Sequence, residues 1–121
     1  MNPIMVDERT VEFTHQFCLT YLASVGYRRL VLIGSRARGT ARPSSDYDFV
    51  AVVSDDAPEE ILSGRNHRLL HQFEKHRDRE GLSKIDLLVA TESRVAETDP
   101  TPDEFIPYAC QSYGKVVRKF G

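Results

Sequence analysis

Two aspartates set two residues apart are the clearest chemical feature of this 121-residue chain. Asp46 and Asp48 lead directly into Phe49 to Val53, an apolar run typical of a buried strand. Side chains two residues apart on a strand point to the same face, so both carboxylates can reach a common site. Carboxylates at the end of an apolar strand repel each other and resist desolvation, and a divalent cation relieves both costs. The pair therefore predicts a magnesium site.

A glycine–serine pair stands ten residues before these aspartates, at the end of another apolar run, Leu30 to Ile33. Gly34 has no Cβ, so the backbone there can approach a phosphate closely. Ser35, at the head of a short helix, offers a hydroxyl and main-chain N–H groups to phosphate oxygens. Arg36 or Arg38 can neutralise phosphate charge. The segment is predicted to bind the phosphates of a nucleotide.

A third acid, Asp86, lies inside the apolar run Ile85 to Val89. Taken alone, it could be an edge-strand charge that prevents aggregation. A helix between two strands of one sheet makes those strands parallel, which brings Asp86 beside Asp46 and Asp48. We therefore predict that these three acids hold two Mg²⁺ ions about 3.5–4 Å apart. Asp86 would lower the pKa of an attacking hydroxyl or take its proton.

The elements that must position these residues follow from hydrophobic spacing and from glycine and proline breaks. They predict an α+β fold, a small mixed β-sheet flanked by helices in the order α-β-α-β-α-β, with a C-terminal helix and a possible edge strand. The expected helices span residues 7–25, 36–41, 58–79 and 103–112, the expected strands 29–33, 47–53 and 84–90, the linker 98–102 and the possible edge strand 115–120.

Composition predicts one globular domain spanning residues 1–121, with a net charge of -2 and 40% hydrophobic residues. No apolar run is long enough to span a bilayer, and the N-terminus lacks the order of a secretory signal. Cys18 and Cys110 lie far apart and are interpreted as free thiols in a reducing cytoplasm. The near-neutral charge argues against direct nucleic-acid binding. We therefore expect a cytoplasmic protein with no membrane contact.

Two further groups of residues have competing interpretations. His67 and His71 are spaced i, i+4 on the expected long helix, which could form a metal site, but a solvated helix face is favoured. Phe105, Tyr108 and Tyr113 could form a partner or adenine-stacking surface. We favour the interpretation that these aromatics cover the sheet.

The motifs resemble a known family. Gly34-Ser35, ten residues and Asp46-Tyr47-Asp48 match the G-S-x10-D-x-D signature of the DNA polymerase β-like nucleotidyltransferase superfamily. Residues 34–39, Gly-Ser-Arg-Ala-Arg-Gly, and Ser45-Asp-Tyr-Asp are closer to the minimal nucleotidyltransferases, and Asp86 matches their third carboxylate. The resemblance implies the nucleotidyltransferase fold and transfer of AMP from ATP to a hydroxyl, with release of pyrophosphate. It also implies the site residues: Asp46, Asp48 and Asp86 as catalytic metal ligands, and Gly34, Ser35, Arg36 and Arg38 as nucleotide contacts.

The resemblance also suggests a partner. Many minimal nucleotidyltransferases are antitoxins encoded beside a HEPN-domain toxin, a ribonuclease, and adenylylate one of its tyrosines. It therefore implies a type VII-like antitoxin that binds a HEPN toxin as a hetero-oligomer. The short tail after Thr91 leaves no separate domain to hold an acceptor, which favours a partner independently. Two alternatives remain: a non-catalytic nucleotide-binding antitoxin or sensor, and a small-molecule nucleotidyltransferase resembling the antibiotic-modifying enzymes.

Overall fold

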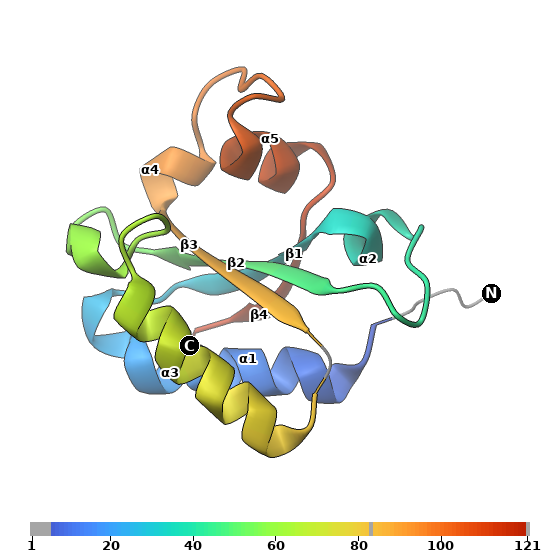
Figure 1. Ribbon diagram of the computed structural model, residues 1–121. Helices are drawn as coiled ribbons and strands as arrows, with labels where there is room; N and C mark the ends of the chain where they lie inside the picture. Colours follow the sequence, from blue (N-terminus) through green and yellow to red (C-terminus); the bar gives the residue numbers. More distant parts are fainter. Residues whose placement is uncertain (1–5, 83, 121) are drawn as a thin grey trace.

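A mixed β-sheet with helices on both faces forms the centre of the computed structural model (Figure 1). The structure describes residues 6–82 and 84–120, and within them the sheet has four strands in the order β3-β2-β1-β4. Strands β2 and β3 are parallel, whereas β1 pairs antiparallel with both β2 and β4. The bounds are Arg29–Ile33 for β1, Tyr47–Val53 for β2, Ile85–Thr91 for β3 and Lys115–Lys119 for β4. The predicted α+β class with a small mixed sheet is confirmed.

The strands agree closely with the hydrophobic pattern. β1 and β2 have the predicted bounds, β3 is shifted by one residue, and the possible edge strand forms as β4. Nearly every residue of β2 is buried, because its side chains are apolar on both faces of the sheet. The prediction that this strand is central is therefore confirmed.

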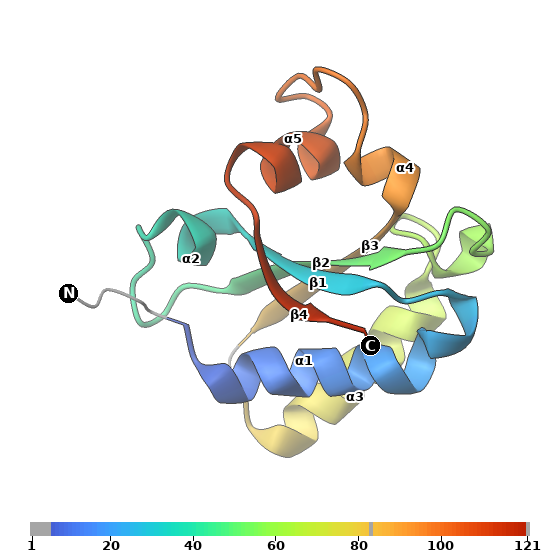
Figure 2. The ribbon, with the colours of Figure 1, turned by 180° about the vertical axis from the view of Figure 1, so that it is seen from behind.

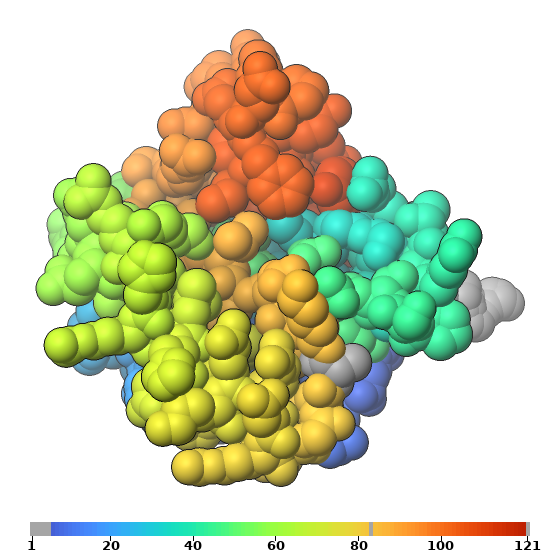
Figure 3. Space-filling model, in the orientation of Figure 1, coloured from blue at the N-terminus to red at the C-terminus, as the bar shows by residue number. Residues whose placement is uncertain are grey.

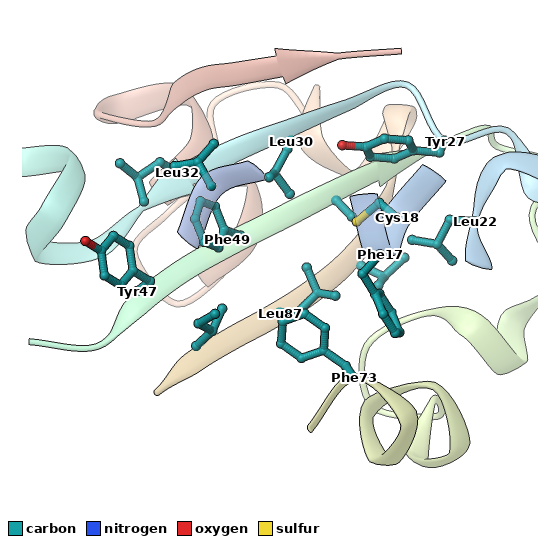
Figure 4. Close-up of a cluster of buried hydrophobic side chains, with 14 of the residues drawn as sticks. Phe17, Cys18, Leu22, Tyr27, Leu30, Leu32, Tyr47, Phe49, Phe73 and Leu87 are labelled. Carbon is teal, nitrogen blue, oxygen red and sulfur yellow. The ribbon is translucent and has the colours of Figure 1, made fainter. Parts of the chain in front are cut away.

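One face of the sheet is covered by α1, Glu8–Tyr21, and α3, His67–Glu80 (Figures 1 and 2). Phe73 is the one buried residue described within α3, and its ring lies 4.9 Å from that of Phe17 and 5.6 Å from that of Phe13, centroid to centroid. Phe49 and Leu87 face the same cluster from β2 and β3 (Figure 4). These contacts hold α1 and α3 against the sheet. The two helices precede and follow the segment that carries the predicted site.

The opposite face is covered by α4, Glu92–Val95, and α5, Phe105–Ser112 (Figure 1). They pack on Val50, Val52 and Ala90, in the later halves of β2 and β3. A short helix, α2, Gly34–Arg38, lies at the other end, directly after β1. The beginnings of β2 and β3, where the aspartates lie, therefore keep access to solvent.

The predicted single helix over residues 58–79 is wrong. A short 3-10 turn, η2, spans Glu59–Ile61, and α3 begins only at His67. Gly64 adopts a left-handed conformation (φ 94°), and Asn66 uses its amide to donate to the Ile61 carbonyl. These local bonds compete with the helical pattern, which the apolar spacing alone could not reveal.

Two smaller predictions also need correction, and one helix was missed. The first helix ends at Tyr21 and continues as a 3-10 turn, η1, over Ala23–Val25. The short helix expected over 36–41 begins two residues earlier and ends at Arg38, because Gly39 takes the left-handed cap conformation. Helix α4 was not predicted; the side chain of Thr91 accepts the Arg94 N–H and caps it.

Cys18 and Cys110 are both free, as predicted. Within residues 6–82 and 84–120, no helix is both long and apolar enough to cross a membrane.

Replacing Phe73 by alanine is expected to lower the free energy of unfolding by about 3–5 kcal/mol, because a buried aromatic ring leaves a cavity between α1 and α3. Urea denaturation followed by circular dichroism measures the change. The matched control is Gln72→Ala, an exposed neighbour on the same helix, with an expected change within about 0.5 kcal/mol. Equal losses in both variants would contradict this assignment of the core.

Candidate active site

Asp48 and Asp86 face each other across β2 and β3. The parallel register pairs their Cα positions directly, and the two carboxyl groups lie close enough to interact. Burial raises the pKa of Asp48 to about 6, helped by its interaction with the Asp86 carboxyl group and by the negative charges of Asp86 and Asp46. The predicted convergence of Asp86 on Asp48 is therefore present in the structure.

Gly34 lies against the Asp48 carboxylate. The antiparallel register of β1 and β2 pairs Ile33 with Asp48, so the next residue begins α2 beside that acid. Gly34 has a φ of 75°, and a Cβ built on it would collide with the Asp48 carboxylate. Both conformation and space require glycine here. The structure thus places Gly34 directly beside Asp48, and the predicted phosphate-binding role of the glycine–serine segment stays a prediction.

Arg36 is 7% exposed and has its contacts on the chain itself. Its guanidinium donates to the carbonyls of Pro43, at 3.2 Å, and Ser45, at 2.7 Å. It also lies 4.1 Å from the ring centroid of Tyr47, the residue between the two aspartates. These contacts indicate that Arg36 positions the loop before β2, and its predicted contact with nucleotide phosphates stays a prediction.

Arg38 is exposed at the end of α2, with its guanidinium 4.8 Å from the ring centroid of Tyr113. It remains accessible to an anionic ligand, unlike Arg36. Ser35 is partly buried in the first turn of α2, and its carbonyl accepts the Thr40 N–H. The predicted nucleotide contacts of Ser35 and Arg38 stay predictions.

Asp46 is turned toward Lys84, with 3.7 Å between its carboxylate and the ammonium group. Within residues 6–82 and 84–120, no group of three His, Cys, Asp or Glu residues is placed to hold one metal ion. The structure thus brings Asp48 and Asp86 into direct contact, whereas Asp46 stands beside them in an ion pair. Sequence reasoning missed Lys84. It lies two residues before Asp86, as Asp46 does before Asp48, so parallel pairing predicts that they meet.

A cleft of about 270 Å³ opens beside the two paired acids. It is bordered by Asp48, Asp86, Glu74 and the exposed ring of Phe105, among other residues. Figure 3 shows this side of the molecule, with the orange-red C-terminal segment above and the yellow α3 below. The cleft gives a substrate access to the acids.

The aromatic and histidine residues with two interpretations can now be placed. Tyr113 packs against both hydrophobic clusters, in agreement with the covering role. Phe105 is 52% exposed at the cleft, which suits contact with a ligand. His67 and His71 are exposed on α3, in agreement with a solvated helix face.

Residues 22–112 match the family described as nucleotidyltransferase domain. The chain belongs to the nucleotidyltransferase domain family. The transferase activity predicted from the motif spacing agrees with this family, and the domain bounds of 1–121 stay a prediction.

Two solved structures resemble this nucleotidyltransferase. One is described as a crystal structure of a toxin-antitoxin with AMP-PNP. It matches with a TM-score of 0.54 and 15% identity, and the matched region covers 87% of this chain and 69% of the chain in that structure. The other is a putative nucleotidyltransferase from Sulfolobus solfataricus, with a TM-score of 0.42, 19% identity and coverage of 75% and 76%. At such identity the first shows the shared fold. No curated protein matches the chain.

Replacing Arg36 by methionine is expected to destabilise the nucleotidyltransferase by about 1–3 kcal/mol, because two carbonyls lose a charged donor in a partly buried site. The loop over residues 39–46 should also become more sensitive to protease. Urea denaturation and limited proteolysis measure both effects. Arg38→Met is the control, since that side chain is exposed. If both variants behave alike, Arg36 has no special role in positioning the loop.

Replacing Asp48 by asparagine is expected to stabilise the metal-free protein at pH 7.5 and to have little effect near pH 4. The folded pKa of about 6 lies above the ordinary 3.8, so the wild type loses stability as pH rises from about 4 to 6. The expected gain above pH 6 is about 1 kcal/mol, less than the full pKa change implies, because water screens a half-exposed carboxylate.

Thermal unfolding in EDTA at both pH values measures this difference. Asp56→Asn, an exposed aspartate outside the cleft, provides the control and should show no comparable pH dependence. A stability gain from Asp48→Asn that is the same at both pH values would show that Asp48 is not the titrating group.

Proposed function

We propose that this protein transfers AMP from ATP to a hydroxyl group of a partner protein, with Mg²⁺ as cofactor. The observation that supports this most is the contact of Asp48 with Asp86 directly beside Gly34. The site combines two acids with a glycine that lets the backbone approach a ligand closely, and it lies beside a cleft. Membership of the nucleotidyltransferase domain family supports the same chemistry.

The donor chemistry of the site fits magnesium. Asp48 and Asp86 are neighbouring carboxylates on paired strands, and a hard divalent cation takes oxygen ligands of this kind. Asp46 would join them on leaving its partly exposed ion pair with Lys84, a weak interaction in water. These three acids would hold two Mg²⁺ ions, which supply charge neutralisation for the triphosphate and activation of the acceptor hydroxyl.

The chain's own residues have distinct tasks in this proposal. Gly34 and Ser35 bind the triphosphate, and Arg38 adds positive charge from the end of α2. The acceptor oxygen attacks the α-phosphorus of ATP, the bond from that phosphorus to the bridging oxygen breaks, and pyrophosphate leaves. Asp86, exposed on the cleft side, accepts the hydroxyl proton.

The partner we propose is a HEPN-type toxin modified on a tyrosine, with this protein as its antitoxin. The motif resemblance and the fold shared with a chain from a toxin-antitoxin crystal structure support this choice. The open cleft also supports a macromolecular acceptor, because its borders come from the same few elements that hold the acids.

A non-catalytic antitoxin is the second candidate, and one observation favours it. Asp46 is paired with Lys84, and within the described part of the chain the three acids do not form a ready metal group. In that case nucleotide or partner binding would persist without transfer.

The test uses purified full-length protein, MgATP and the protein encoded next to it if that neighbour is all-helical with an Arg-x4-6-His motif. We expect α-phosphate label, and no γ-phosphate label, on a tyrosine of the partner, seen also as one AMP mass increment. Asp48→Asn should lower the rate by about 100-fold or more, since metal ligation and charge stabilisation are lost together.

Asp56→Asn provides the matched control and should keep the wild-type rate. A verified partner that is neutralised equally well by wild type and Asp48→Asn, without any mass increment, would support the non-catalytic antitoxin. Label on an aminoglycoside, with none on the protein, would identify a small-molecule transferase.

A further inference from the structure

On the outer edge of β3, the main-chain groups of Val89 are bonded to the chain's own loop, whereas those beside Asp86 have no partner within the described residues. β3 pairs only with β2 within the described residues, so its other side is a sheet edge. Val89 has both edge groups bonded: its N–H donates to the Ser63 hydroxyl at 2.7 Å, and its carbonyl accepts the Ser63 N–H at 3.0 Å. The fold therefore protects the later part of this edge.

Leu87 presents the same main-chain groups two residues earlier, without such protection. The Tyr47 N–H donates to the Lys84 carbonyl, so residues 84, 86 and 88 direct their main-chain groups toward β2. Leu87 alternates with them and faces outward like Val89. Among residues 6–82 and 84–120, nothing bonds its outer N–H or carbonyl.

The cleft beside the acids follows this open edge. Leu87 lines it but is only 3% exposed, so an incoming main chain reaches its N–H and carbonyl only when the neighbouring side chains of α3 move aside. Unpaired N–H and carbonyl groups that lack water are costly, and an incoming main chain would satisfy both. Glu74 borders the cleft from α3, and Asp86 and Phe105 border it from the other face of the sheet.

We propose that an extended segment of the acceptor protein adds to β3 at Leu87 as an extra strand, and that this places its hydroxyl residue beside Asp86. The inference rests on the proposed function and identifies how the acceptor is held. Neighbours across paired strands share a face, so the residue opposite Asp86 points to the acid side of the sheet. Gly34 and α2 lie on the β1 side of Asp48, which leaves the β3 side for the acceptor.

The residue next to the hydroxyl residue points to the opposite face, toward Glu74. Together with Asp48 and Asp86, Glu74 makes the cleft negative, so a lysine or arginine is the complementary neighbour. The occupant is therefore an extended peptide in which a basic residue adjoins a tyrosine, serine or threonine.

The first experiment titrates the ¹⁵N-labelled full chain with the blocked peptide Thr-Val-Lys-Tyr-Val-Thr, without ATP. We expect the Leu87 amide proton to shift downfield, while the Val89 amide, already bonded to Ser63, stays unchanged. Two further peptides are methylated on the main-chain nitrogen of Lys or of Tyr. Successive N–H groups of the peptide point alternately toward and away from β3. Methylation of the N–H that faces β3 should therefore weaken binding about tenfold, and methylation of the neighbouring N–H should leave binding unchanged. Equal binding by both methylated peptides, or no response at Leu87, would overturn strand addition.

The second experiment reverses charge. Glu74→Lys should weaken binding of the Lys-Tyr peptide about fivefold and strengthen binding of a Glu-Tyr peptide. Glu80→Lys, on the same helix but outside the cleft, should change neither. Identical results for the two variants would overturn the predicted preference for a basic neighbour.

A third measurement separates this inference from the proposed function. With MgATP labelled at the α-phosphate, the Tyr peptide should become labelled, and the same peptide with Phe should bind without label. Peptide bound at Leu87 but never labelled would contradict AMP transfer and leave the docking mode standing. Label on a partner protein with no response at Leu87 would overturn the docking mode and leave the transferase standing.

Discussion

The contact between two carboxyl groups in the parallel register of β2 and β3 is the constraint on which the site depends. Asp48 lies directly opposite Asp86, so the sheet fixes the backbone positions of the two acids. Burial first, and then the neighbouring acids Asp86 and Asp46, raise the cost of ionising Asp48, which is why its pKa rises to about 6. The sheet is stabilised by the apolar remainder of both strands, and it imposes the electrostatic conflict that a cation would resolve.

The surrounding residues maintain this conflict rather than remove it. Gly34 leaves room for the Asp48 carboxylate, where any larger residue would displace it. Arg36 stacks on Tyr47 and donates to two loop carbonyls, so its positive charge stabilises the loop before β2. Lys84 pairs with Asp46 in partly exposed surroundings, where such a pair is easily exchanged. The half-buried carboxyl group of Asp48, with its raised pKa, therefore costs stability in the metal-free protein at neutral pH.

Spacing and hydrophobic period predicted β1 and β2 to the residue and placed Asp86 near Asp48, because a helix crossover makes β2 and β3 parallel and brings their beginnings to the same end of the sheet. The same reasoning failed where local side-chain bonds decide the backbone: Ser63 and Asn66 interrupt the helix expected over 58–79, and Thr91 starts an unforeseen one. It did not foresee that Arg36 binds the chain's own carbonyls, since composition cannot tell which acceptors a guanidinium meets. Asp46 and Lys84 meet because each lies two residues before one of the paired acids. The sequence contains this correspondence, but it becomes evident only when the register of β2 and β3 is known.

The failure at Ser63 bears on function as well as on boundaries. A continuous helix over 58–79 would leave no loop to bond Val89, and the whole outer edge of β3 would be open to other strands. The interrupted segment instead closes the edge at Val89 and stops short of Leu87, at the level of the acids. Among the described residues, Leu87 is thus left without an outer main-chain partner at the level where an acceptor hydroxyl would need to be held. Specificity for an extended polypeptide can arise from this arrangement, because main-chain pairing fixes register while the loop at Val89 limits how far a strand can extend.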